Sequence, residues 1–256
     1  MKQLAKKLKL LKDIGVSGIK QSFEDEGVLL GDVVKMRRLC DLVNIKLSVK
    51  IGGCEAITDL NNCLNFGADS IVAPMIESEF GLQKYAESIN SNATKEQKEE
   101  TNFYINIESK QAYNNLNYIL QSPSSKILSG IVVGRSDLTK SFGHGKQNVD
   151  STEMNNIVKT ILKDAKSLNL ITIIGGNIGK TSIKFINELY NSMLLDYIET
   201  RNVILKLNEN NVKILQSAIK DILHFESDWL VHKHLYYLKF SKNYLSRSEE
   251  ILNRIL

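Results

Sequence analysis

Two acidic residues follow two short apolar segments of this chain. Glu108 ends the segment 103–108, and Asp137 closely follows the segment 130–134. In a parallel α/β fold the carboxyl ends of the strands lie on one face, where ligands bind, so we expect these carboxylates to be neighbours. Neighbouring carboxylates repel each other unless a cation lies between them, and Mg²⁺ is a hard cation that prefers oxygen ligands. The pair therefore predicts a magnesium site at a strand-end face.

Short β-prone runs alternate with longer helical stretches along most of the chain. The runs are residues 18–23, 47–51, 70–75, 104–107, 131–133, 171–174 and 197–201. This alternation predicts a parallel sheet with helices outside it. A doubly wound sheet is the alternative, but no GxGxxG or Walker motif follows the first run. Polar residues at the ends of the runs favour a (β/α) barrel of the TIM type.

The pattern lacks the first strand of such a barrel. It contains seven runs, whereas a TIM barrel has eight strands, and an amphipathic helix over residues 4–14 occupies the start of the chain. We therefore expect a barrel that is incomplete or modified at its N-terminal strand. The N-terminal helix or a partner subunit would then cover the gap.

The last part of the chain predicts a helical extension. Residues 208–256 contain neither glycine nor proline, and the segment 228–238 is rich in aromatic residues. We divide the chain into a barrel domain, residues 1–207, and an extension, residues 208–256, that packs on the barrel or on a neighbouring subunit. An aromatic helix of this kind is either packed on its own domain or placed at an interface, and we expect a homo-oligomer.

Composition narrows the functional class. The 256 residues are 43% hydrophobic and 24% charged, which is typical of a globular protein. No segment has the length of a membrane helix and the N-terminus does not resemble a signal peptide, so we expect a cytoplasmic protein without a membrane partner. The net charge of +4 is spread along the chain, which argues against nucleic-acid binding. Cys40, Cys54 and Cys63 have no CxxC spacing, and we expect reduced thiols.

The order of the motifs resembles that of the HpcH/HpaI aldolase and citrate lyase β-subunit family, a branch of the phosphoenolpyruvate-binding TIM barrels. Residues 105–108 and 131–143 carry the resemblance most clearly, the second with Gly-Arg-Ser-Asp-Leu and a later glycine. The segment 67–78 is similar to the family strand that ends in Pro-Met/Lys-Val-Glu. The resemblance extends over residues 14–205.

The resemblance implies a Mg²⁺ or Mn²⁺ ion held by Glu108 and Asp137. The ion would bind the keto oxygen and the carboxylate of a pyruvate-like unit and stabilise an enolate. The implied activity is that of a metal-dependent carbon–carbon lyase or aldolase acting on a 2-keto acid, with an aldehyde or acyl compound as the second partner. The residues expected to contact the substrate are Pro74, Glu77, Glu55, Gly134, Arg135 and Ser136.

Several positions depart from the family pattern. Lys50 stands where the family usually has an arginine; it supplies charge without the bidentate fork, or acts instead as a Schiff-base nucleophile. The usual histidine base is missing, and Glu24 or Glu26 is the candidate replacement. Arg201 is expected either to supply the missing guanidinium or to form a buried ion pair with Glu199.

Three functional hypotheses therefore stand. The first is the 2-keto acid lyase or aldolase. The second is a lyase for an acyl-CoA ester, of the citrate lyase type. The third is a catalytically degenerate barrel that acts as a binding or regulatory protein, because the histidine is missing and the arginine is replaced.

Overall fold

The computed structural model describes residues 1–24 and 27–255 and contains a closed barrel of eight strands in sequence order. The strands are β1 (Val16–Ser22), β2 (Lys46–Lys50), β3 (Ser70–Ala73), β4 (Asn102–Ile107), β5 (Gly130–Gly134), β6 (Ile171–Gly175), β7 (Tyr197–Glu199) and β8 (Val203–Lys206). Neighbours from β1 to β7 pair in parallel. The predicted (β/α) barrel is confirmed.

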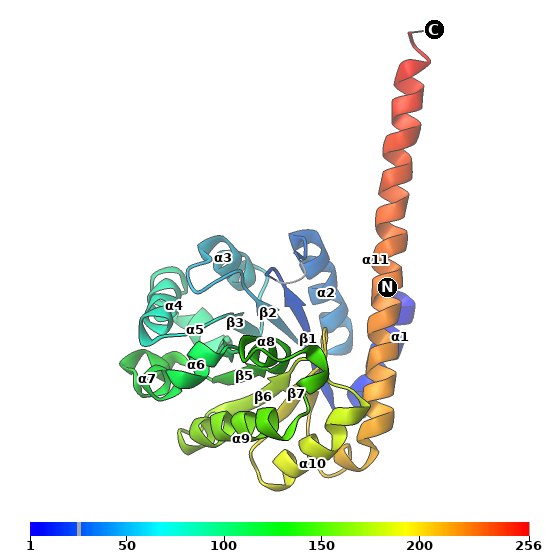
Figure 1. Cartoon of the computed structure of the whole chain (residues 1–256). Helices are drawn as coiled ribbons and strands as arrows, with labels where there is room; N and C mark the ends of the chain where they lie inside the picture. The colour runs from blue at the N-terminus through cyan, green and yellow to red at the C-terminus, as the bar shows by residue number, and fades with distance from the viewer. Residues whose placement is uncertain (25–26, 256) are drawn as a thin grey trace.

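Helices surround the barrel (Figure 1). They are α1 (Lys2–Asp13), α2 (Leu30–Val43), α3 (Ile57–Asn65), α4 (Glu79–Asn92), α5 (Lys95–Glu100), α6 (Lys110–Asn114), α7 (Leu116–Gln121), α8 (Arg135–Ser141), α9 (Thr152–Ser167), α10 (Ile183–Asn191) and α11 (Leu215–Leu252). Short 3₁₀ turns η1 (Pro123–Ile127), η2 (Lys146–Asn148), η3 (Lys180–Ser182) and η4 (Val212–Ile214) join them. None of the helices described is long and apolar enough to cross a bilayer.

The predicted count of seven strands is wrong, and no gap remains for a helix or a partner to cover. The eighth strand, β8, begins a few residues after β7 and runs antiparallel to both β7 and β1. The sequence pattern missed it because it is short and has no crossover helix before it. The modification of the barrel is thus a C-terminal hairpin that closes the sheet, rather than a defect at the N-terminal strand.

Alternation along the strands separates two environments. Outward residues such as Ile19, Val49, Ile105 and Ile131 are fully buried against the helices. The opposite positions face the inside of the barrel, and many of them are polar. Because side chains alternate along a strand, the polar residues that end the strands point into the barrel mouth.

The predicted C-terminal helix is confirmed as α11. Its first half packs against α1, and Trp229 is buried there. Tyr237 donates a hydrogen bond to Asp32 of α2 at 2.7 Å, and Lys233 lies 3.4 Å from the same carboxylate. Beyond this contact the helix continues away from the barrel (Figure 1).

Candidate active site

A pocket of about 660 Å³ opens at the carboxyl ends of the strands. Residues from β1, β2, β4, β5, β7, α8 and α11 and from the loops after β5, β6 and β7 surround it. The lining comprises Lys20, Lys50, Asn106, Gly134, Ser136, Asp137, Lys140, Lys146, Gly176, Asn177, Ile178, Glu199, Thr200, Arg201, Leu223 and Glu226. It therefore brings together Lys50, Gly134, Ser136, Asp137 and Arg201, five of the residues that the sequence predicts for the site.

Glu108 lies just after β4 with its carboxylate buried. Its Oε2 accepts a hydrogen bond from the Asn106 side chain at 2.8 Å, and its Oε1 accepts one from the backbone N–H of Met75 at 3.1 Å. Burial raises the pKa of Glu108, and the nearby Asp137 carboxylate raises it further, although Lys50 and the two hydrogen bonds act in the opposite direction. Because burial and Asp137 both disfavour the charged form of Glu108, a further cation beside it would stabilise the carboxylate.

Lys50 connects two predicted acidic residues. Its Nζ lies 2.8 Å from Oε2 of Glu24 and 3.5 Å from Oε2 of Glu108, and the residue is only 6% exposed. The ammonium group therefore sits between a buried carboxylate and a partly exposed one. Glu26, the other candidate base, lies outside the residues that the structure describes.

The oxygen atoms of Glu108 and its neighbours would suit a hard divalent ion. The Oδ1 atom of Asn106 is buried and accepts no hydrogen bond from the described residues, although the amide group of the same side chain donates to Glu108. Asp137 is half exposed and pairs with Lys140 at 2.9 Å. No group of three His, Cys, Asp or Glu residues suited to a metal occurs in the described parts of the chain. Two carboxylates agree with Mg²⁺, which commonly binds one or two carboxylates and keeps several waters.

Glycines allow the close packing of this site. A Cβ atom on Gly134 would lie 2.6 Å from Oε2 of Glu108, so only glycine leaves room for the carboxylate at the end of β5. Gly176 has a φ of 82°, and an added Cβ would lie 2.5 Å from the backbone nitrogen of Ser136 and 3.0 Å from that of Arg135. These contacts set the first turn of α8 beside Glu108.

The structure also shows site residues that the sequence did not reveal. Lys20 of β1 donates to Oε1 of Glu199 at 2.6 Å, inside the barrel. A lysine within a β-prone run was the available signal, because a charged side chain there must face the lumen or a partner. Arg201, which the sequence did predict, lines the same pocket from the loop between β7 and β8. It is exposed and Glu199 pairs with Lys20, so the alternative of a buried Arg201–Glu199 ion pair is wrong.

Glu226 enters the pocket from α11. It accepts hydrogen bonds from the Thr200 hydroxyl and the Asn202 N–H, each at 2.5 Å, and burial raises its pKa. The division at residue 207 remains a prediction, but the predicted extension supplies part of the pocket wall. No local pattern distinguishes this glutamate from others of the helix, since only the tertiary fold buries it.

Four predicted contact residues lie apart from the pocket lining. Arg135 is 1% exposed, and its guanidinium group pairs with Asp150 at 2.7 Å and also donates to the carbonyls of Gly175 and Gly176. The predicted contact of the Arg135 side chain with the substrate is therefore wrong, because the side chain points into the protein and joins the loops after β5 and β6. The sequence alone does not reveal in which direction the backbone turns after a strand, and that direction decides where the side chain points.

The other three have protein partners. Glu55 is more than half exposed and pairs with Lys84 at 3.1 Å. Glu77 accepts a hydrogen bond from the Ser109 hydroxyl at 2.5 Å. Pro74 precedes Met75, whose φ of 51° places its backbone N–H on Glu108. Pro74 and Glu77 therefore lie close to the Glu108 loop, whereas the Glu55 carboxylate is turned to the surface.

The family model for HpcH/HpaI aldolase/citrate lyase matches residues 44–179, which is more than half of the chain. The chain belongs to this family. The resemblance seen in the sequence is confirmed, and an aldolase or citrate lyase type of activity follows at that level of detail. The match includes Lys50, Glu108 and Asp137. No curated protein sequence shows a significant match.

Several solved structures share the fold. An HpcH/HpaI aldolase from Desulfitobacterium hafniense DCB-2 superposes with a TM-score of 0.62 at 10% identity, over 77% of this chain and 81% of its own. An HpcH/HpaI aldolase/citrate lyase family protein from Burkholderia cenocepacia J2315 superposes with a TM-score of 0.62 at 14% identity, over 87% of this chain and 90% of its own. The citrate synthase SbnG superposes with a TM-score of 0.59 at 15% identity, over 88% of this chain and 98% of its own. At these identities the likeness shows the barrel alone.

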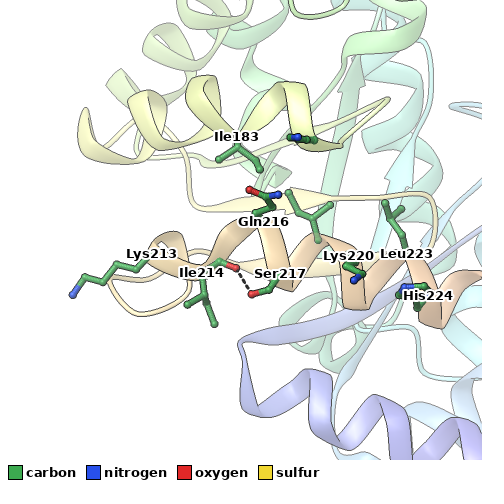
Figure 2. A pocket seen from close by; sticks show the side chains of 10 residues that line it. Ile183, Lys213, Ile214, Gln216, Ser217, Lys220, Leu223 and His224 are labelled. Carbon is green, nitrogen blue, oxygen red and sulfur yellow. Dashed lines mark hydrogen bonds between the residues drawn. The ribbon is translucent and has the colours of Figure 1, made fainter.

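A groove lies beside the candidate active-site pocket, between α10 and the start of α11 (Figure 2). Its volume is about 780 Å³, and Ile183, Ile214, Ile219 and Leu223 supply apolar lining. Its basic lining residues are Lys180, Lys213, Lys220 and His224. Leu223 belongs to this groove and to the pocket, so the two spaces adjoin.

Proposed function

We propose that this protein is a metal-dependent carbon–carbon lyase or aldolase that acts on a 2-keto acid through a pyruvate-type enolate. The observation that supports it most is the buried Glu108 carboxylate, which lies near Asp137 and beside the cation of Lys50. Family membership supports the reaction class, and the donor set supports the metal.

Mg²⁺ or Mn²⁺ would be held by Glu108 and Asp137, with Asn106 Oδ1 available to a bound water. When bound, such an ion supplies Lewis-acid polarisation of a keto oxygen. Asn106 and the Met75 N–H keep the Glu108 carboxylate oriented, since each donates a hydrogen bond to a different oxygen. Orientation of a ligand by its neighbours typically changes metal affinity by about 10–100-fold.

The remaining residues act directly on the substrate. The Lys50 ammonium group, which lies between Glu24 and Glu108, would attract negative charge that develops on the substrate oxygen. Glu24 is the only candidate base among the residues the structure describes in its loop, and it would take a proton from the carbon next to the keto group. The N–H groups of Gly134 to Asp137 at the start of α8 would bind the substrate carboxylate.

Deuterium exchange at C3 of pyruvate tests the proposal. The wild type with Mn²⁺ should exchange, and Glu108→Gln should lose the exchange at least a hundredfold. Glu96→Gln, in an exposed part of α5, is the matched control and should behave as the wild type. Full exchange by Glu108→Gln would rule out the role of Glu108. A wild type that neither binds Mn²⁺ in calorimetry nor exchanges would favour the degenerate-barrel hypothesis.

The groove of Figure 2 favours a second candidate, a lyase for an acyl-CoA ester. Its apolar floor and three lysines suit an extended ligand with anionic groups, and Leu223 joins it to the pocket. Under this candidate, Lys213→Glu with Lys220→Glu should raise the KM for an acyl-CoA substrate more than tenfold and leave pyruvate exchange unchanged. Equal KM values would leave the 2-keto acid reaction with a small aldehyde as the better proposal.

We also propose that the protein is a homo-oligomer joined through the outer half of α11. Two adjacent columns of exposed apolar residues repeat every seven positions along it: Leu230 and Val231, Tyr237 and Leu238, Tyr244 and Leu245, Ile251 and Leu252. The small residues Ser241 and Ser248 lie between the columns and allow a close approach. A period of seven is that of helices that pair along their length, and a second copy offers the same period and polarity.

A further inference from the structure

A second cavity lies inside the barrel at the end opposite the candidate active site. Its volume is about 350 Å³, at the lower end of the range of roughly 300–1,000 Å³ for small-molecule sites. Residues of all eight strands line it: Ser17, Gly18, Lys46, Ser48, Ser70, Val72, Asn102, Tyr104, Val132, Ile171, Ile173, Tyr197, Glu199, Ile204 and Lys206. Glu199 is the single residue shared with the lining of the active-site pocket.

The cavity exists because small residues occupy inward positions. The interior of a TIM barrel is normally filled by bulky branched side chains in layers. Here Gly18, Ser48 and Ser70 stand at such positions. Gly130 has a related effect, because an added Cβ would lie 2.8 Å from the Tyr104 ring. The absence of a side chain at Gly130 therefore leaves room for the Tyr104 ring beside β5.

The polar groups around the cavity have spare hydrogen-bonding capacity. The side-chain hydroxyls of Ser48, Ser70, Tyr104 and Tyr197 form no hydrogen bond with other residues in the described part of the chain. These four residues come from β2, β3, β4 and β7, so their hydroxyls surround the space. Hydroxyl groups in such a position bond to water or to a ligand.

The mouth of the cavity carries excess positive charge. Lys46 of β2 and Lys206 of β8 lie on either side of β1, and neither pairs with an acid within residues 1–24 and 27–255. Glu199 is the acidic residue of the lining, and Lys20 neutralises it at 2.6 Å. Asp196, near Tyr104, pairs with Lys166 at 2.5 Å. Two cations are thus left to attract an anion.

We propose that the N-terminal mouth of the barrel is a second binding site, for a small molecule with an anionic group, either a carboxylate or a phosphate. Lys46 and Lys206 would bind the anionic group, and the hydroxyls of Ser48, Ser70, Tyr104 and Tyr197 would bind its polar remainder. The inference is independent of the reaction at the other end of the barrel, because no residue of the metal site takes part.

Titration of the full chain with inorganic phosphate and with succinate tests the proposal. At least one of these probes should bind the wild type saturably in calorimetry. The variant Lys46→Glu with Lys206→Glu should weaken that binding at least tenfold. The control Lys9→Glu with Lys163→Glu changes the net charge by the same amount at exposed positions of α1 and α9, and it should bind like the wild type. Glu108→Gln should also bind like the wild type.

A filling variant keeps the test independent of surface charge. Ser70→Leu places an apolar side chain in the cavity and leaves both lysines in place, so it too should weaken binding at least tenfold. Thermal unfolding identifies any variant that has lost its fold. The proposal is overturned if neither probe binds the wild type, if both charge variants lose binding equally, or if a folded Ser70→Leu protein binds at full strength.

Discussion

Lys20 and Glu199 form an ion pair across the inside of the barrel, with 2.6 Å between Nζ and Oε1. The pair joins the first parallel strand, β1, to β7 although β8 lies between them in the sheet. Both side chains line the candidate active-site pocket, and Glu199 also lines the cavity at the N-terminal mouth of the barrel. The pair therefore forms the floor between the two spaces.

Breaking this pair on one side should destabilise the fold. Glu199→Gln leaves the Lys20 ammonium group, which is 17% exposed, without its partner. We expect a loss of about 3 kcal/mol in the free energy of unfolding by urea. The double variant Lys20→Met with Glu199→Leu should recover most of it, because it removes both charges of the pair. Glu99→Gln, which removes the exposed Lys95–Glu99 pair, should cost less than about 1 kcal/mol. Equal losses in both single variants would contradict the burial argument.

Glu108 should make stability depend on pH. Because burial raises its pKa above 4.5, the folded protein binds more protons than the unfolded chain between 4.5 and the raised value. The contribution of Glu108 to stability is therefore greatest below 4.5, falls as pH rises through that window and is constant above it. Glu108→Gln lacks this dependence, so its stability relative to the wild type should increase with pH in urea unfolding measured without metal. A constant difference would show that the carboxyl titrates normally.

The same proton should compete with the metal. Below the pKa of Glu108, Mn²⁺ affinity should fall by about tenfold per pH unit, since a proton must leave for the ion to bind. Calorimetry in two buffers of different ionisation enthalpy would detect the released proton. Affinity that does not change with pH would place the ion away from Glu108.

Gly134 should be essential for the proposed metal site. Gly134→Ala would force a Cβ to within 2.6 Å of the Glu108 carboxylate, which must then move. We expect Mn²⁺ affinity to fall by roughly 10–100-fold, as for other changes that reorient a ligand. Gly53→Ala meets no atom within 4 Å and is the matched control. Similar affinities of the two variants would argue that Glu108 does not bind the ion.

The outer half of α11 should control the oligomeric state. Leu238→Lys with Leu245→Lys places charges in the repeating columns, so sedimentation should show a monomer where the wild type shows an oligomer. Phe80→Lys with Tyr118→Lys changes exposed apolar residues elsewhere and should leave the state unchanged. A monomeric wild type would refute this interface. Pyruvate exchange at the wild-type rate in the monomer would show that each barrel works alone.

The sequence alone determined the barrel and the long C-terminal helix, because apolar runs and helical periodicity are local properties. It also identified the two acids, Glu108 and Asp137, that we propose as metal ligands, because they belong to local strand-end motifs. It also identified the thiols correctly: Cys40, Cys54 and Cys63 are free, and burial raises the pKa of Cys40 to about 12.

Only the tertiary structure decided which side chains share a space. β8 closes the sheet because β7 and β1 both need a partner, which no local pattern shows. Arg135 turns inward to Asp150, while Lys20 and Glu226 reach the pocket from opposite ends of the chain. These outcomes depend on the direction of the backbone after each strand and on burial by elements that are distant in the sequence. The spacing of residues within one segment specifies neither the direction of the backbone nor the burial.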